Sequence, residues 1–91
     1  MAVYMVVATF RQGTDMDEVF AVADAERAQV KVLTAEGRMG QIHLAIPQGK
    51  VFIEVFADDD AAAEATIMTL PISKWWDLEI YPTMVPPRAG D

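Results

Sequence analysis

The sequence predicts an α+β domain with the element order β-α-β-β-α-β, in which two helices cover one face of a four-stranded antiparallel sheet. Three observations indicate this class. Four short segments are rich in β-branched and aromatic residues, two longer segments have helical spacing or are rich in alanine, and turn residues separate them. We therefore expect one compact domain without internal repeats.

The first strand and the first helix are expected in the N-terminal part. Residues 2–10 are rich in Val, Tyr and Phe and precede a polar, glycine-containing break, which indicates a strand and then a loop. The helix should begin at an N-cap, either Thr14 or Asp15, and end at Gly37. Its core-facing stripe consists of Met16, Val19, Ala23, Val30 and Leu33.

A hairpin and the second helix follow. Residues 39–46 and 51–56 have strand composition, and Pro47-Gln48-Gly49-Lys50 between them is typical of a turn. Asp58-Asp59-Asp60 should cap the second helix, because acidic residues are favoured at the positive end of a helix dipole. Pro71 should end that helix, since proline cannot continue one.

The fourth strand is expected at residues 78–81, before a proline-rich end. We expect residues 1–84 to form a single domain and residues 85–91 to form an extended C-terminal tail. The predicted order is the ferredoxin-like plan, in which both helices lie on one face of the sheet. The other face of such a sheet needs a cover.

Alternation along the strands predicts which residues each face presents. The set expected under the helices is Val3, Met5, Val7, Ile42, Leu44, Ile46, Val51, Ile53, Val55, Leu78 and Ile80. The set expected on the open face is Tyr4, Val6, Ala8, Phe10, Gln41, His43, Ala45, Phe52, Glu54, Phe56, Glu79 and Tyr81. Because aromatic residues alternate with His and Glu there, we expect a homodimer packed sheet to sheet around a pocket, and higher assembly stays open.

Composition excludes several kinds of partner and site. The chain has 91 residues, with 14 Asp and Glu against 7 Lys and Arg, which argues against nucleic acid as a partner. It has no cysteine and one histidine, so disulfides, thiolate chemistry and a zinc site are not expected. The apolar N-terminal segment has no basic leader and is too short to span a bilayer, so we expect a cytoplasmic protein without membrane contact.

Three residues are candidates for acid–base catalysis. Glu26 lies inside the apolar stripe of the first helix, where burial would raise its pKa towards neutrality and suit it to moving a proton between carbons. The alternative is a carboxylate at the helix edge, paired with a cation of the sheet. His43 is expected near Tyr4 on the open face, although a lone histidine is more often structural. We take Glu26 as the proton shuttle, assisted by His43 or Tyr4.

Aromatic and acidic residues later in the chain are candidates for substrate binding. The set is Phe52, Glu54, Phe56, Trp75, Trp76 and Tyr81. Glu54 belongs either to a paired-carboxylate site or to the polar rim of the interface. The adjacent Trp75 and Trp76 must point in different directions, so one is expected in the core and the other at a rim or pocket. The chain has no nucleotide-binding, hydrolase or zinc-protease motif, so we expect no cofactor and no metal.

Two stretches carry a resemblance to a known family. They are residues 25–37, which contain Glu26, and residues 65–80, where Leu70-Pro71 precedes a short aromatic turn and an acidic-apolar strand. They resemble the muconolactone isomerase-like family of small dimeric α/β-barrel proteins, and the likeness spans most of residues 2–82. The resemblance implies isomerisation of an unsaturated lactone by proton movement, with Glu26 matching a proposed acid or base of the family's pocket.

The sequence thus leads to one principal hypothesis and two alternatives. The principal hypothesis is a cofactor-free, isomerase-like enzyme that moves a proton on a small unsaturated lactone or related carbonyl compound. Proteins with the implied fold also include cofactor-free oxygenases and polyketide-tailoring proteins, so an oxygenase or cyclase is the first alternative. The second is a non-catalytic oligomer that binds a small apolar ligand.

Overall fold

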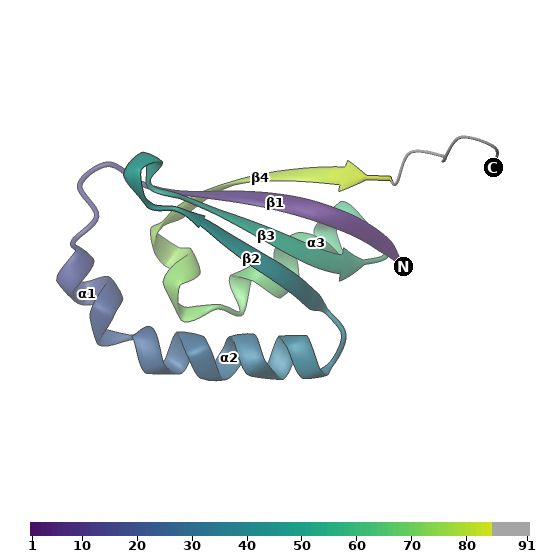
Figure 1. The fold of residues 1–91 in the computed structure, drawn as a ribbon, viewed down its shortest axis with the longest axis horizontal. Helices are drawn as coiled ribbons and strands as arrows, with labels where there is room; N and C mark the ends of the chain where they lie inside the picture. Colours follow the sequence, from purple (N-terminus) through teal and green to yellow (C-terminus); the bar gives the residue numbers. More distant parts are fainter. Residues whose placement is uncertain (85–91) are drawn as a thin grey trace.

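The computed structural model describes residues 1–84 and has an α+β architecture (Figure 1). The strands are β1 (Ala2–Phe10), β2 (Met39–Ala45), β3 (Lys50–Ala57) and β4 (Trp76–Thr83). The helices are α1 (Met16–Ala21), α2 (Ala23–Ala35) and α3 (Asp60–Met68), with short 3₁₀ helices η1 (Ile46–Gln48) and η2 (Pro71–Trp75). The predicted tail, residues 85–91, lies outside the described residues.

The strands form one antiparallel sheet in the order β2-β3-β1-β4. The α-helices all lie on the same side of this sheet (Figure 1). The predicted α+β class with a four-stranded antiparallel sheet is therefore confirmed, and its strand order is compatible with the ferredoxin-like plan. Within residues 1–84, no helix combines the length and the apolar character needed to cross a membrane.

The first predicted helix is in fact two helices that meet at Val22. Asp15 caps α1, because its carboxylate accepts a hydrogen bond from the N–H of Asp17 at 2.9 Å. At Val22 the backbone leaves helical geometry (φ −106°, ψ 13°), and α2 continues from Ala23 in a different direction (Figure 1). The expectation of one continuous helix is wrong here. Val22 is β-branched and a weak helix former, which permits the break.

The other boundaries fall near the predicted ones. Asp59 caps α3 by accepting a hydrogen bond from the N–H of Ala62 at 2.7 Å, and Pro71 opens η2 after the helix has ended. The turn between β2 and β3 ends at Gly49, whose φ of 65° is a left-handed conformation that glycine adopts without a steric penalty. β4 begins at Trp76, earlier than the predicted residue 78.

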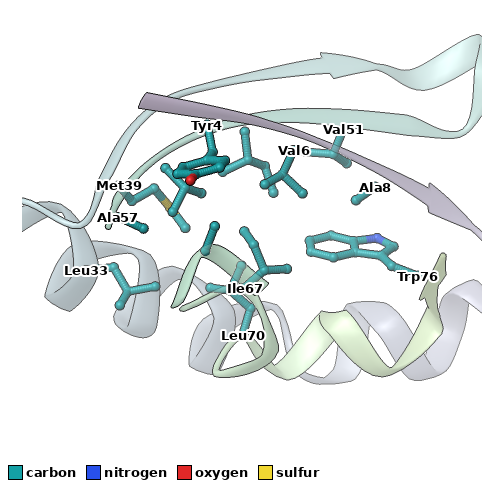
Figure 2. Packing of buried hydrophobic residues seen from close by; sticks show 13 residues of the cluster. Tyr4, Val6, Ala8, Leu33, Met39, Val51, Ala57, Ile67, Leu70 and Trp76 are labelled. Carbon is teal, nitrogen blue, oxygen red and sulfur yellow. The ribbon is translucent and has the colours of Figure 1, made fainter. Parts of the chain in front are cut away.

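The hydrophobic core corrects the predicted faces of β1. Tyr4, Val6 and Ala8 are buried against the helices (Figure 2). The alternate residues Val3 and Met5 are only partly buried and lie on the open face. Phe10 has the same alternation as Tyr4, Val6 and Ala8, so it lies on the helix side and packs against the core. Val7 lies on the open face with Val3 and Met5. The expected assignment is wrong because both parities of β1 are apolar, so alternation alone does not choose between them.

The faces predicted for β3 and β4 are those observed. Val51, Ile53 and Val55 of β3 are buried under the helices, and Leu78 and Ile80 of β4 pack against the same core. Tyr4, Val6 and Ala8 pair with Val55, Ile53 and Val51, respectively. The register with β3 therefore sets the orientation of β1.

Candidate functional site

An apolar cavity of about 430 Å³ lies between the sheet and the helices α1 and α2. Its walls include Val19, Ala23 and Val30 from the helices and Ile42, Val51 and Ile53 from β2 and β3. The wall surface is almost entirely carbon. This volume suits a small organic ligand, since ligand sites in proteins measure roughly 300–1,000 Å³.

Exposed apolar side chains surround the mouth of the cavity. Phe20 of α1 is 67% exposed and Ile46 of η1 is 70% exposed, and both line the cavity together with Met16 and Leu44. Ala23, the first residue of α2, contributes only a methyl group to the wall and so leaves space inside. The break before Ala23 and the turn after β2 therefore place an apolar entrance at the protein surface.

Among residues 1–84, Glu26 is one of two ionisable residues that line the cavity. It is partly buried on α2, and its Oε1 accepts a hydrogen bond from the backbone N–H of Ile72 at 3.0 Å. Burial raises the pKa of Glu26, and the hydrogen bond from Ile72 opposes part of that increase. The other ionisable residue, Arg27, pairs with Asp24 and its side chain is 74% exposed.

Trp76 forms another part of the cavity wall and is 5% exposed. Its ring meets that of Phe10 edge to face, with the centroids 5.9 Å apart. The indole Nε1–H is buried and has no acceptor among the described residues. A buried donor without a partner is costly, so this N–H lowers the stability of the core beside the cavity.

Several predicted site residues lie on the open face of the sheet instead. His43, Phe52 and Glu79 lie in one row across this face, where His43 pairs with Phe52, Phe52 with Val7 and Val7 with Glu79. Nε2 of His43 lies 3.2 Å from Oε1 of Gln41. Tyr81 donates a hydrogen bond to Glu79, and the carboxylate of Glu79 raises the pKa of Tyr81.

Glu54 and Phe56 also lie on the open face, beside an irregularity in β2. Oε1 of Glu54 accepts a hydrogen bond from the backbone N–H of Gln41 at 3.2 Å. A Cβ at Gly40 would lie 2.1 Å from this Oε1 and 3.1 Å from Cζ of Phe56. Glycine at this position therefore lets the carboxylate of Glu54 fold back onto the strand.

Tyr4 and Trp75 lie apart from both groups. Tyr4 is buried at the opposite end of the core from Trp76 (Figure 2). Burial, and then the carboxylate of Asp60, raise the pKa of Tyr4. Trp75 belongs to η2, is partly exposed and has the ammonium group of Lys74 4.5 Å from its ring centroid.

The structure therefore brings two of the predicted site residues, Glu26 and Trp76, to one cavity. The sheet separates this cavity from His43 and the aromatic residues of the open face. Sequence reasoning missed Phe10 as a wall residue, because the parity of β1 was assigned the other way. It also missed the cavity itself, for which the only sequence signal is small Ala23 within an apolar stripe.

A second hollow of about 420 Å³ lies on the other side of η2 and is more polar. Arg11 lines it, but its guanidinium donates to the carboxylate of Asp77 and to the carbonyl oxygens of Lys74 and Trp76. Among residues 1–84, no group of three or more His, Asp or Glu residues is arranged to hold a metal ion. The apolar cavity is thus the better candidate for a small-molecule site.

The chain matches no family model, and no curated protein matches its sequence.

Proposed function

We propose that this protein binds a small, apolar carbonyl compound such as an unsaturated lactone in the apolar cavity and moves a proton on it without a cofactor. The observation that carries the proposal is the partly buried Glu26 in a wall that is otherwise almost entirely carbon. A raised pKa makes the carboxylate a stronger base, and a pKa closer to the working pH suits a group that must both accept and return a proton. A carboxyl group that lines a cavity and has a raised pKa is a candidate functional group.

In the proposed reaction, the ionised Glu26 takes a proton from a carbon activated by the carbonyl group. The C–H bond breaks, an O–H bond forms on the carboxyl group, and the electron pair moves into the conjugated system as a dienolate. Glu26 then returns the proton to a different carbon, so that the double bond shifts and no proton is gained or lost overall. The reaction needs no oxidant and no metal ion.

A hydrogen bond at the cavity wall favours this chemistry. The backbone N–H of Ile72 holds one oxygen of Glu26, which restricts the orientation of the carboxyl group. His43 and Tyr4 do not line the cavity, so Glu26 acts in this proposal without their assistance.

The experiment is proton exchange in D₂O. We expect deuterium to enter an unsaturated lactone such as α-angelica lactone in the presence of the protein, as followed by NMR, without oxygen uptake. Glu26→Gln should lower the rate by about 100-fold or more, because a positioned acid–base group contributes roughly 10²–10⁴-fold. Glu64→Gln, a matched change of an exposed glutamate on α3 outside the cavity, should leave the rate unchanged.

Equal rates in wild type and Glu26→Gln would refute the proposed mechanism. Oxygen consumption with an aromatic ketone would favour the oxygenase alternative. The almost purely carbon wall and the hydrogen bond from Ile72 to Glu26 also suit a second candidate function, ligand binding without chemistry. Binding of the lactone with no deuterium incorporation would favour that candidate.

We further propose that a second copy of the chain covers the open face, so that two sheets form a dimeric α/β barrel. Val3, Met5, Val7, Phe52 and Phe56 make this face apolar while leaving it only partly buried in one chain. An apolar sheet face of this kind is typical of an interface. The ferredoxin-like strand order is consistent with such an assembly.

Light scattering tests the assembly. We expect a dimer for the wild type and a monomer for Met5→Lys, because the introduced ammonium group would be desolvated at the centre of the interface. Val32→Lys changes an exposed apolar residue of α2 and is the matched control, which should remain dimeric. A monomeric wild type at micromolar concentration would refute the dimer.

A further inference from the structure

We propose that the apolar cavity selects its ligand by charge: it admits an uncharged carbonyl compound and excludes the carboxylate and the ammonium compound built on the same skeleton. This inference rests on the proposed function for the place of binding and adds the class of substrate. The cavity of about 430 Å³ has the volume of roughly 14 water molecules at about 30 Å³ each, which corresponds to a compound of about 10–15 non-hydrogen atoms.

Among the described residues, the cavity offers a bound anion no buried cation. Its one basic residue, Arg27, is directed to solvent, since its side chain is 74% exposed and pairs with Asp24. The other basic residues within residues 1–84 do not line it. They are Arg11, Lys31, Arg38, Lys50 and Lys74.

These cations are engaged or exposed elsewhere in the described chain. Arg11 holds η2 and β4, and Lys74 lies over the ring of Trp75. Lys50 donates to the hydroxyl group of Thr9, and Arg38 donates to that of Thr66. None of them is therefore positioned to neutralise a carboxylate inside the cavity.

A carboxylate ligand would meet two penalties at once. It would lose its hydration against a carbon wall that offers almost no donor, and a buried charge without a partner is strongly unfavourable. It would also lie near the carboxyl group of Glu26, and like charges repel more strongly where water is excluded. Both effects favour an uncharged ligand.

An ammonium ligand would gain only one partner. Glu26 is the acidic residue that lines the cavity, and its Oε1 already accepts a hydrogen bond from Ile72. An ammonium group brings three N–H donors, and the carbon wall offers the remaining donors no acceptor. Desolvation then exceeds what a single partly buried carboxylate returns.

The experiment compares three compounds that share one ring system. The probes are the methyl ester of coumarin-3-carboxylic acid, the free carboxylate and 3-(aminomethyl)coumarin, each measured by equilibrium dialysis near pH 7. We expect the ester to bind and the two charged compounds to bind at least about 100-fold more weakly. A 100-fold difference in affinity corresponds to about 2.8 kcal/mol, which is less than the cost of burying a charge without a partner. Carboxylate binding within about tenfold of the ester, or amine binding tighter than the ester, would overturn the inference.

Variants locate the binding and test the origin of the selectivity. Ala23→Phe fills the cavity and should abolish ester binding, whereas Ala28→Phe on the exposed part of the same helix should not. Glu26→Gln removes the like charge and should narrow the difference between carboxylate and ester affinity several-fold. The control Glu64→Gln should leave that difference unchanged. The inference would also be overturned if the ester did not bind to the wild type. The same holds if ester binding survived Ala23→Phe but was lost in Ala28→Phe.

The outcomes separate this inference from the proposed function. Charge selectivity measured by dialysis needs no turnover, so it can hold even when no deuterium enters the lactone. Conversely, isomerisation of a carboxylate-bearing lactone by wild type but not by Glu26→Gln would support the proposed proton transfer and overturn the selectivity.

Discussion

Replacing Arg11 by methionine should destabilise the domain by about 2 kcal/mol and loosen the cavity wall at Trp76. Arg11 directly follows β1, and its guanidinium group makes three hydrogen bonds. Nε donates to Asp77 at 3.0 Å, Nη1 to the carbonyl oxygen of Lys74 at 2.5 Å, and Nη2 to that of Trp76 at 2.9 Å. The side chain therefore joins the end of β1 to η2 and to the start of β4.

The magnitude follows from the exposure of each partner. The side chains of Arg11 and Asp77 are 53% and 74% exposed, so their ion pair contributes little, about 0–0.5 kcal/mol. Hydrogen bonds from a charged donor contribute roughly 1.5–3 kcal/mol, which we reduce to about 1 kcal/mol for each carbonyl bond because the donor is half exposed. The sum is about 2 kcal/mol, which lowers Tm by roughly 8–16 °C in a domain of this size.

Thermal and urea denaturation of Arg11→Met and Asp77→Asn provide the assay. Asp77→Asn removes the ion pair and keeps both carbonyl bonds, so it should cost no more than about 0.5 kcal/mol. Dialysis of the coumarin ester should show weaker binding to Arg11→Met, because Trp76 loses its support. Equal stability losses in the two variants would contradict a role for the two carbonyl bonds, since loss of the ion pair would then account for the whole effect.

Three further predictions concern the site, the open face and the core. Ionised Glu26 opposes folding because its pKa is raised in the folded protein. This cost in stability is present above the folded-state pKa and disappears as pH falls towards the unfolded-state pKa. In urea titrations, the free energy of unfolding of Glu26→Gln relative to wild type should therefore be higher near pH 7 than near pH 4. Gly40→Ala should cost about 1 kcal/mol by expelling the carboxylate of Glu54 from its backbone partner, and this cost should shrink in a Glu54→Ala background, as measured by a double-mutant cycle. Leu33→Ala should cost about 3 kcal/mol because Leu33 is fully buried, whereas Val32→Ala, at a position that is 47% exposed, should cost less than about 1 kcal/mol by the same denaturation assay.

The candidate site was predictable from the sequence only in part. Glu26 stood out because a carboxylate interrupts an apolar helical stripe, and the structure does place it in an apolar wall. Trp76 was one of two possible pocket tryptophans, and the first pairing of β4, with Phe10, directs it under the helices. His43 was expected near Tyr4, but the two residues lie on opposite faces of the sheet because the faces of β1 are reversed.

Local sequence patterns were enough to predict the order of the strands along the chain, a first cap at Thr14 or Asp15, a second cap within residues 58–60, and the apolar stripe that contains Glu26. These features depend on neighbouring residues, such as a cap next to its own helix or a period of 3.6 along a single segment. They hold whatever the rest of the chain does.

Contacts between distant segments settle which face of β1 lies under the helices and which residues share the cavity. In β1 both parities are apolar, so the choice came from the pairing of Val6 with Ile53 in β3, a contact between residues distant in sequence. The hydrogen bond from Ile72 to Glu26 likewise follows from how α2 packs against η2. Such contacts are not written in the local pattern of any segment, because each depends on a register or packing partner elsewhere in the chain.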